Sequence, residues 1–348
     1  MKSLPRFLVL TGGAFVAGLV LLGVVLGVLG YDPGAAFRAL ISGSLGSWHA
    51  LSSATLVRAT PLILLGLGFS LAWRAGGLNI GMEGQFLAGA IVATWIGLHV
   101  GALPGVVAQP LVLLGAFAAG AGWIALPIFL KQRFGVLEVI STLLLNFVAE
   151  ALVSWMVLGP LQEAKRSYPQ SDLIAVSAQL PHVPGGRLHA GFMVVILLAI
   201  GAHLLFHHTM AGFQLRATGL GPVAARLSGR IPVNRVLVLA LLGSGALAGL
   251  GGGMEVSGVT YALFQNLSPG YGFSAIAVAL LARGEPIVII GTGLLFGALE
   301  AGAGAMQREA GIPAVAVAIV QATIIIAVLV TESIGRRRLR AISPAGVV

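Results

Sequence analysis

A few polar side chains interrupt the long apolar runs of this sequence. Asn79, Glu83 and Gln85 open a run that otherwise stays apolar as far as Leu98. If this run crosses a membrane, an ionised carboxylate at its centre costs at least about 2.5 kcal/mol, so Glu83 is not expected to face lipid. The three side chains are therefore candidates to line a solute path. The alternative is that they tie helices together or lie near the cytoplasmic edge of the membrane.

A second polar set recurs at a helical spacing. Glu138, Thr142, Asn146 and Glu150 lie four residues apart, so their side chains share one face of a helix. Such a stripe must face protein or water. Asn146 and Glu150 are thus candidates for the same solute path. The alternative is hydrogen bonding between helices, which contributes about 0.6 to 2 kcal/mol per contact in membranes.

Two other motifs favour structural roles. The first is a run of glycines at every fourth position, Gly245, Gly249 and Gly253, which predicts a groove for close helix packing. The second is a histidine cluster at the inner end of an apolar run, formed by His203, His207 and His208. No second ligand group with metal spacing accompanies these histidines, so they are interpreted as a cluster at the headgroup level rather than a metal site.

Motifs for catalysis are missing from the sequence. Gly-x-x-x-x-Gly-Lys-Ser/Thr does not occur, which excludes ATP hydrolysis by a P-loop of this chain. Gly-x-Ser-x-Gly and His-Glu-x-x-His are also missing, and there is no cysteine for thiol chemistry or metal binding. An intramembrane enzyme is therefore poorly supported.

The elements that must position the polar residues are membrane spans. Of the 348 residues, 57% are hydrophobic and 9% are charged, and the mean hydropathy is +1.00. These values lie far from those of soluble domains and predict an all-α integral membrane protein with a single domain over residues 1–348. The net charge of +9 does not indicate nucleic acid, because the basic residues lie between apolar runs.

Ten apolar runs predict about ten transmembrane helices. They cover residues 7–29, 51–73, 78–98, 106–130, 136–158, 192–206, 236–256, 273–282, 287–306 and 315–331, of which the eighth is short. Two polar stretches separate them, an external loop at about 159–190 and a cytoplasmic loop at about 210–235.

The basic residues indicate the orientation. With the N-terminus inside, fourteen of the twenty Lys and Arg residues are cytoplasmic; Arg58 lies within a span, and the outside holds Arg38, Lys165, Arg166, Arg187 and Arg308. Cytoplasmic loops carry such an excess of basic residues. Both termini are therefore predicted to be cytoplasmic.

The two halves of the chain suggest an inverted repeat. Segments two to five and seven to ten run in opposite directions, and each set has a span interrupted by Gly or Pro, near residues 76–84 and 269–272. Inverted repeats with broken helices are typical of transporters, because the broken ends expose backbone groups that can coordinate a solute.

Several ordered stretches resemble one family of membrane proteins. They are NIGMEGQFLAGA at 79–90, EVISTLLLNFVAEALVSWMVLGPL at 138–161, RATGLGPVAARLSGR at 216–230 and SGALAGLGGGMEVSG at 244–258. Together they resemble the permeases of the branched-chain amino acid, ribose and nucleoside branch of the type II ABC importers. The stretch at 79–85 is most similar to the permeases for nucleosides and simple sugars.

The resemblance implies that the loop at 210–235 holds a coupling helix for a separate ATPase. In the family, the pattern is like Gly-x-Asn-Pro-x-Ala-Ala-x-x-x-Gly, and the matching residues here are Gly219, Pro222, Ala224, Ala225, Arg226 and Gly229. Gly221 stands where Asn is usual, and Arg230 where an apolar residue is common. The residues agree with a short helix, because Pro222 would start it and Gly229 would end it. The alternative is a basic loop held by anionic headgroups.

The resemblance also implies the role and the partners of the chain. It would be the permease subunit of an ABC importer in a bacterial cytoplasmic membrane, moving nucleosides or simple sugars. ATP would be used by partner ATPase subunits, and no cofactor would be bound by this chain. A second permease, identical or related, and an extracytoplasmic substrate-binding lipoprotein would complete the transporter. An ion-coupled secondary transporter that depends on Glu83 or Glu150 is the alternative.

Overall fold

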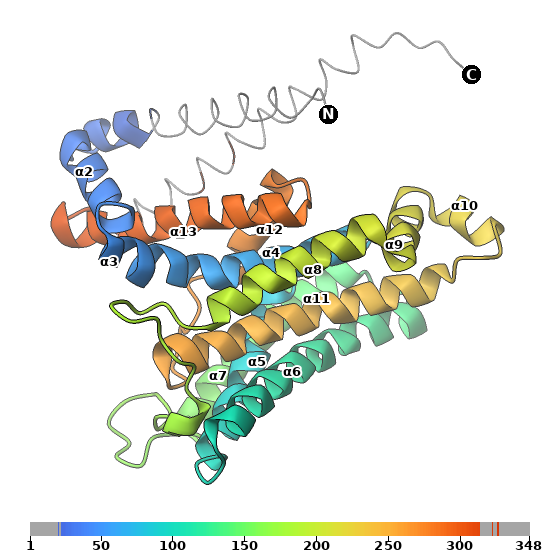
Figure 1. Ribbon diagram of the computed structural model, residues 1–348, viewed down its shortest axis with the longest axis horizontal. Helices are drawn as coiled ribbons and strands as arrows, with labels where there is room; N and C mark the ends of the chain where they lie inside the picture. Colours follow the sequence, from blue (N-terminus) through green and yellow to red (C-terminus); the bar gives the residue numbers. More distant parts are fainter. Residues whose placement is uncertain (1–19, 21, 314–321, 323–325, 327–348) are drawn as a thin grey trace. The chain divides into compact units, whose positions relative to one another are not determined.

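The computed structural model describes residues 20, 22–313, 322 and 326 of the chain (Figure 1). Within these residues the backbone forms helices and no strand; two isolated bridges pair Gln170 with Phe264 and His182 with His189. The all-α prediction is thus confirmed. The main helices are α2 (Pro33–Ser44), α3 (Trp48–Ala50), α4 (Leu56–Arg74), α5 (Met82–His99), α6 (Gly105–Phe134), α7 (Glu138–Leu158), α8 (Gly191–His208), α9 (Met210–Leu220), α10 (Pro222–Leu227), α11 (Val233–Glu255), α12 (Tyr271–Leu281) and α13 (Pro286–Glu309).

The chain divides into two compact units, which are described separately. One unit combines residues 1–51 with 298–348, and the other is residues 52–297. In the first unit, Asp32 caps α2, because its side chain accepts a hydrogen bond of 2.8 Å from the Gly34 N–H and Pro33 is the first helical residue. The prediction of one domain stays a prediction.

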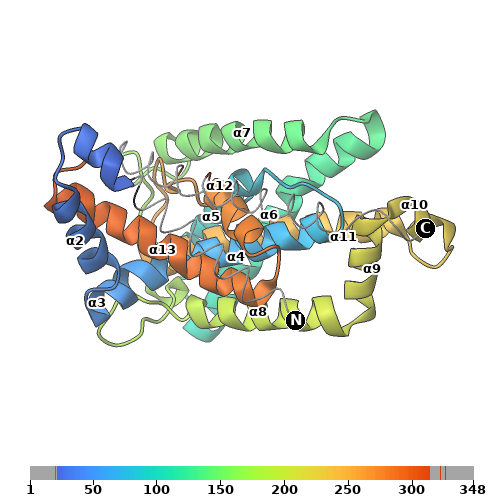
Figure 2. The same ribbon diagram turned by 90° about the horizontal axis from the view of Figure 1, so that it is seen from above.

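The centre of the second unit is α11, which packs on α4, α5 and α6. Its glycines allow this close approach. A Cβ added at Gly249 would overlap the carbonyl oxygen of Ala116 on α6, and one at Gly253 would come within 2.5 Å of the Ala116 side chain. The glycine groove predicted from the four-residue spacing is therefore confirmed. Figure 2 shows α7 and α8 on opposite sides of α4, α5 and α11.

Six helical stretches of the described residues are long and apolar enough to cross a membrane: 48–74, 105–134, 138–158, 191–208, 233–260 and 286–309. Two further predicted segments also fall on helices. These are α5, whose 18 residues are mostly buried, and α12, which has 11 residues. The tenth segment, 315–331, and most of the first, 7–29, lie outside the described residues. The count of ten and the inverted repeat therefore stay predictions.

Two breaks between helices organise the second unit. The first break is residues 75–81, between α4 and α5. It begins where Gly76, with a φ of +85°, takes a left-handed conformation, and where the N–H of Gly77 donates to the Ala72 carbonyl oxygen at 3.0 Å. The second break is residues 261–270, between the π-helical turn Val256–Thr260 and α12. Helix α5 begins four residues later than the predicted segment at 78, because residues 78–81 belong to the first break.

The polar stretch at 159–190 packs along the second break. Its backbone N–H groups at Ser171 and Ile174 donate to the carbonyl oxygens of Leu263 and Tyr261, at 2.8 and 2.9 Å. His189 is buried in this stretch, and burial, assisted by the nearby His182, lowers the pKa of His189 to about 4. The loop is therefore an ordered part of the second unit.

Candidate solute pocket and coupling loop

The first break carries a buried network of amide side chains. The Asn79 Nδ2 group donates to Gln85 Oε1 at 2.8 Å and to Ser244 Oγ on α11 at 2.9 Å. The Asn79 Oδ1 atom accepts from Gln85 Nε2 at 2.9 Å and from the Gly81 N–H at 3.1 Å. Asn79 and Gln85 are both buried. Their hydrogen-bonding groups thus join the first break to the start of α5 and to α11.

Asn146 on α7 binds the backbone around the same break. Its Oδ1 atom accepts from the Gly84 N–H at 2.8 Å, and its Nδ2 group donates to the Ile80 carbonyl oxygen at 3.0 Å. The first N–H groups of a helix have no partner inside the helix. Asn146 therefore supplies a partner to the first turn of α5 from a neighbouring helix.

Glu83 connects α5 to the second break. Its Oε2 atom accepts a hydrogen bond of 2.6 Å from the Gly272 N–H in the first turn of α12, and the Ser268 hydroxyl also hydrogen-bonds to it. The first N–H groups of a helix have no partner inside the helix, so an oxygen atom from a neighbouring helix can satisfy one of them. The buried Glu83 carboxyl group is therefore held where α5, the second break and α12 meet.

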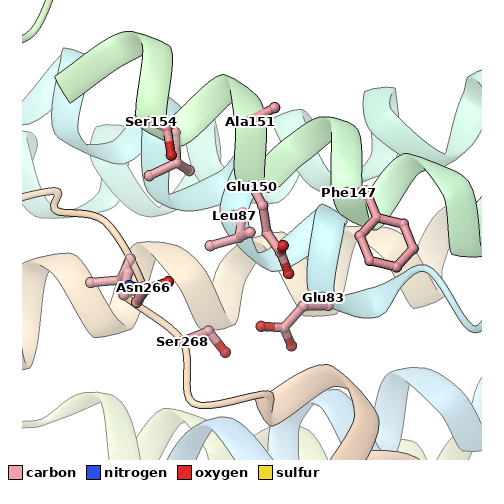
Figure 3. A pocket seen from close by; sticks show the side chains of 10 residues that line it. Glu83, Leu87, Phe147, Glu150, Ala151, Ser154, Asn266 and Ser268 are labelled. Carbon is pink, nitrogen blue, oxygen red and sulfur yellow. The ribbon is translucent and has the colours of Figure 1, made fainter. Parts of the chain in front are cut away.

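A pocket of about 340 Å³ lies beside Glu83 (Figure 3). Figure 3 shows Glu150 on α7 with its carboxylate directed toward Glu83, while Asn266 and Ser268 come from the second break. The lining therefore combines two carboxylates, an amide, hydroxyls and an aromatic ring, and its members are Glu83, Leu87, Phe147, Glu150, Ala151, Val153, Ser154, Asn266, Leu267 and Ser268.

The five residues predicted to line a solute path fall into two groups. Glu83 and Glu150 line the pocket. Asn79, Gln85 and Asn146 are not among its lining residues and bond to other parts of the protein instead. The structure also adds lining residues to those predicted, above all Asn266, Ser268 and Phe147. A signal for two of them was present, because Ser268 immediately precedes the Pro269 to Gly272 interruption and Asn266 lies three residues before it.

The loop between α8 and α11 forms the helix that the sequence predicts. Helix α10 begins at Pro222, and Gly229 follows its end with a φ of +67°. Pro222, Ala224, Arg226 and Gly229 are exposed, whereas Ala225 is buried. Two large apolar side chains on the same helix are also exposed, Val223 at 71% and Leu227 at 83%. Helix α10 thus presents an apolar and basic surface.

Gly219 differs from the other matched residues of the loop. A Cβ at Gly219 would overlap the carbonyl oxygen of Arg74 at the end of α4, and it would lie 3.1 Å from the backbone nitrogen of Gly76. Gly219 therefore positions the base of the loop against α4, whereas α10 extends beyond it (Figure 1).

A charged cluster lies at the same end of the second unit. Arg74 on α4 and His207 on α8 contact opposite oxygens of the Glu285 carboxylate, at 2.5 Å and 2.9 Å. Partial burial alone would raise the pKa of Glu285, but the hydrogen bond from His207 and the charge of Arg74 outweigh burial and hold this pKa below its ordinary value. The cluster joins the ends of α4 and α8 to the turn before α13.

Comparison with known proteins assigns the class of the chain. Residues 51–329 match the model of a family described as the branched-chain amino acid transport system / permease component. The chain therefore belongs to this permease family, and the predicted resemblance to ABC permeases is confirmed.

Three relatives show how far this similarity extends. The glucose ABC transporter permease protein TsgB13 of Haloferax volcanii is 38% identical over 333 residues, which cover 92% of this chain and 87% of the relative. The guanosine ABC transporter permease protein NupP of Bacillus subtilis is 35% identical over 320 residues, 90% of each chain. The nucleoside ABC transporter permease protein NupB of Lactococcus lactis is 34% identical over 324 residues, 90% of this chain and 88% of the relative. The chain is thus a transport subunit with apolar helices that span a membrane several times.

Proposed function

We propose that this permease imports nucleosides or simple sugars through the pocket beside Glu83 and Glu150. The observation that carries the proposal is the chemistry of the lining, which offers two carboxylates, the Asn266 amide and the Ser268 hydroxyl around one space. Carboxylates accept hydrogen bonds from hydroxyl groups, and an amide both donates and accepts. The relatives are named for glucose, guanosine and nucleosides, all of which carry a ring with adjacent hydroxyl groups.

The wall of the pocket formed by α7 supports a role for a second permease. Glu150 is exposed on this helix, and Phe147 beside it is 60% exposed. A carboxylate is unfavourable against lipid. A second permease, identical or related, would cover this face of α7 and close the pocket between the two subunits.

The exposed surface of α10 supports docking of an ATPase. Val223 and Leu227 offer apolar contacts, and the exposed Arg226 offers a positive charge, whose hydrogen bond to Asn234 is long, at 3.5 Å. Rigid-body movements of docked subunits can switch a transport path between two sides. ATP would bind to the ATPase, and this chain would hold no cofactor of its own.

The orientation proposed for the chain follows from its charges. The α10 end of the second unit holds Arg216, Arg226, Arg230 and Arg235, so it would lie in the cytoplasm, with both termini on the same side. The opposite end, with the stretch at 159–190, would receive solute from an extracytoplasmic binding lipoprotein. The membrane would be a bacterial cytoplasmic membrane. Reporters active only outside the cytoplasm should be silent when fused at Val348 and active near Ser171.

The proposal is tested by uptake into proteoliposomes that contain the permeases with their ATPase. Guanosine or glucose uptake should require ATP and survive an ionophore that collapses ion gradients. An ion-coupled secondary transporter would show the reverse.

Deletion of residues 222–229, or Arg226→Glu, should abolish ATPase capture while the permease still inserts. Full uptake by the deletion variant would remove the coupling role of α10.

A further inference from the structure

A second group of side chains with ligand chemistry lies outside the lining of the pocket, at the end of α8. His203 and His207 are one helical turn apart on α8, and their ring centroids are 4.7 Å apart. Glu285 comes from the turn between α12 and α13, and its Oε2 atom lies 2.9 Å from His207 Nε2. One potential ligand atom from each of the three residues lies within 4.8 Å of the others.

We propose that His203, His207 and Glu285 form a binding site for a divalent transition-metal ion of the Zn²⁺ type. Imidazole nitrogen and carboxylate oxygen are ligands that Zn²⁺ prefers, at about 2.0 to 2.2 Å. Two ligand atoms on a tetrahedral ion are then roughly 3.4 Å apart. Small rotations of the three side chains therefore suffice to bring the ligand atoms onto one ion.

One buried nitrogen atom of the cluster lacks a hydrogen-bond partner among the described residues. His203 Nδ1 is buried, and no hydrogen-bond partner for it exists among the described residues. Buried polar atoms are normally paired, since leaving one unpaired costs about 1 to 3 kcal/mol. Coordination of a metal ion through His203 Nδ1 would give this buried atom its missing partner.

Arg74 limits the affinity of this site and also orients it. The guanidinium binds Oε1 of Glu285 at 2.5 Å and the Gly284 carbonyl oxygen at 3.0 Å, so Oε2 is left facing the histidines. Hydrogen bonds of this kind fix the direction of a ligand carboxylate. The positive charge also disfavours a second cation, so a Kd in the micromolar range is expected rather than one near those of structural zinc sites.

The proposed metal site lies next to the base of the loop that carries α10. Arg216 on α9 donates a hydrogen bond to the Phe206 carbonyl oxygen, beside His207, and α9 leads directly into α10. An ion on His203, His207 and Glu285 would fasten the end of α8 to the turn between α12 and α13. Movement at the base of the coupling loop would be restricted, so occupancy should slow transport.

The test is equilibrium binding of Zn²⁺ to the purified full-length permease, carrying an affinity tag without histidines. Wild-type protein should bind one ion per chain, and Co²⁺ in the same site should show the visible absorption of a tetrahedral complex. His203→Gln should weaken Zn²⁺ binding at least about tenfold. The matched control is His208→Gln, which removes the neighbouring histidine outside the three-residue set and should leave the affinity unchanged.

Two results would overturn the proposal. One is equal weakening by His203→Gln and His208→Gln, which would indicate nonspecific binding to a histidine-rich surface. The other is a wild-type Kd weaker than about 1 mM. A cooperative thermal unfolding transition without metal, measured for both variants, shows that the comparison is made on folded protein. Binding is read directly, so the outcome does not depend on which solute the permease carries.

Discussion

The two breaks of the second unit contain similar residue types but differ in what those residues face. At the first break, Asn79 and Gln85 bond to each other, to α11 and to nearby backbone. At the second break, Asn266 and Ser268 line a pocket together with Glu83 and Glu150. A polar residue in an apolar run therefore shows that lipid is avoided, but it does not show whether protein or solute takes the place of lipid.

The largest effect should come from Asn146→Leu, which removes the partner of two backbone groups at the first break. Gly84 N–H and Ile80 C=O would lose their bonds, and each unpaired buried group costs about 1 to 3 kcal/mol. We expect a strong fall in the thermal stability of the purified permease. The control is Thr142→Val on the same stripe, whose hydroxyl bonds to carbonyl oxygens of its own helix. An Asn146→Leu protein with normal stability but no uptake would place Asn146 on the solute path after all.

The next effect concerns the pocket. Glu150→Gln replaces a charged acceptor of solute hydroxyl groups by an amide. Hydrogen bonds to charged groups contribute about 1.5 to 3 kcal/mol, so uptake should fall about tenfold or more. Stability should stay near that of the wild type, because Glu150 is exposed. Initial uptake rates in proteoliposomes measure the change. Glu138→Gln is the control, since Glu138 pairs with Lys131 and the Leu78 N–H away from the pocket. Equal losses in both variants would argue against a special role for the pocket.

A smaller effect is expected for Gln85→Leu. Asn79 would lose one pair of bonds but keep those to Ser244 and to the Gly81 N–H. The expected destabilisation is about 1 to 2 kcal/mol, with uptake per folded molecule unchanged. Thermal unfolding and uptake normalised to folded protein separate the two quantities. Loss of uptake without loss of stability would assign Gln85 to the solute path.

The smallest effect concerns pH and the loop on the second break. His189 has a pKa of about 4 in the folded protein against an ordinary value of 6.5, so the unfolded chain takes up a proton that the folded chain does not. The stability from this residue is complete above about pH 6.5 and falls as the pH drops toward 4. At pH 5.5 the loss should be about 1 kcal/mol. Unfolding measured against pH should show a weaker acid dependence for His189→Gln than for the wild type. An unchanged acid dependence in this variant would contradict the prediction.

Much of the architecture could be predicted from local patterns in the chain. Apolar runs indicated the helices, and the four-residue glycine spacing indicated the packing face of α11. Pro222 marked the start of α10, and Gly229 marked the turn that follows its end. These features depend on residues close together in the sequence, whose helical periodicity and backbone preferences act locally. The family followed from the order of such motifs.

The partners of the polar side chains were decided by the tertiary structure. Asn79 meets Ser244 across 165 residues of sequence, and Glu83 meets Gly272 across 189. Glu285 joins His207 across 78 residues, which is why no metal-ligand spacing is visible along the chain. A polar residue in an apolar run is predicted not to face lipid. Whether that group then binds a backbone amide, a neighbouring side chain or a solute depends on which helices pack together, and no pattern within a single helix encodes that choice.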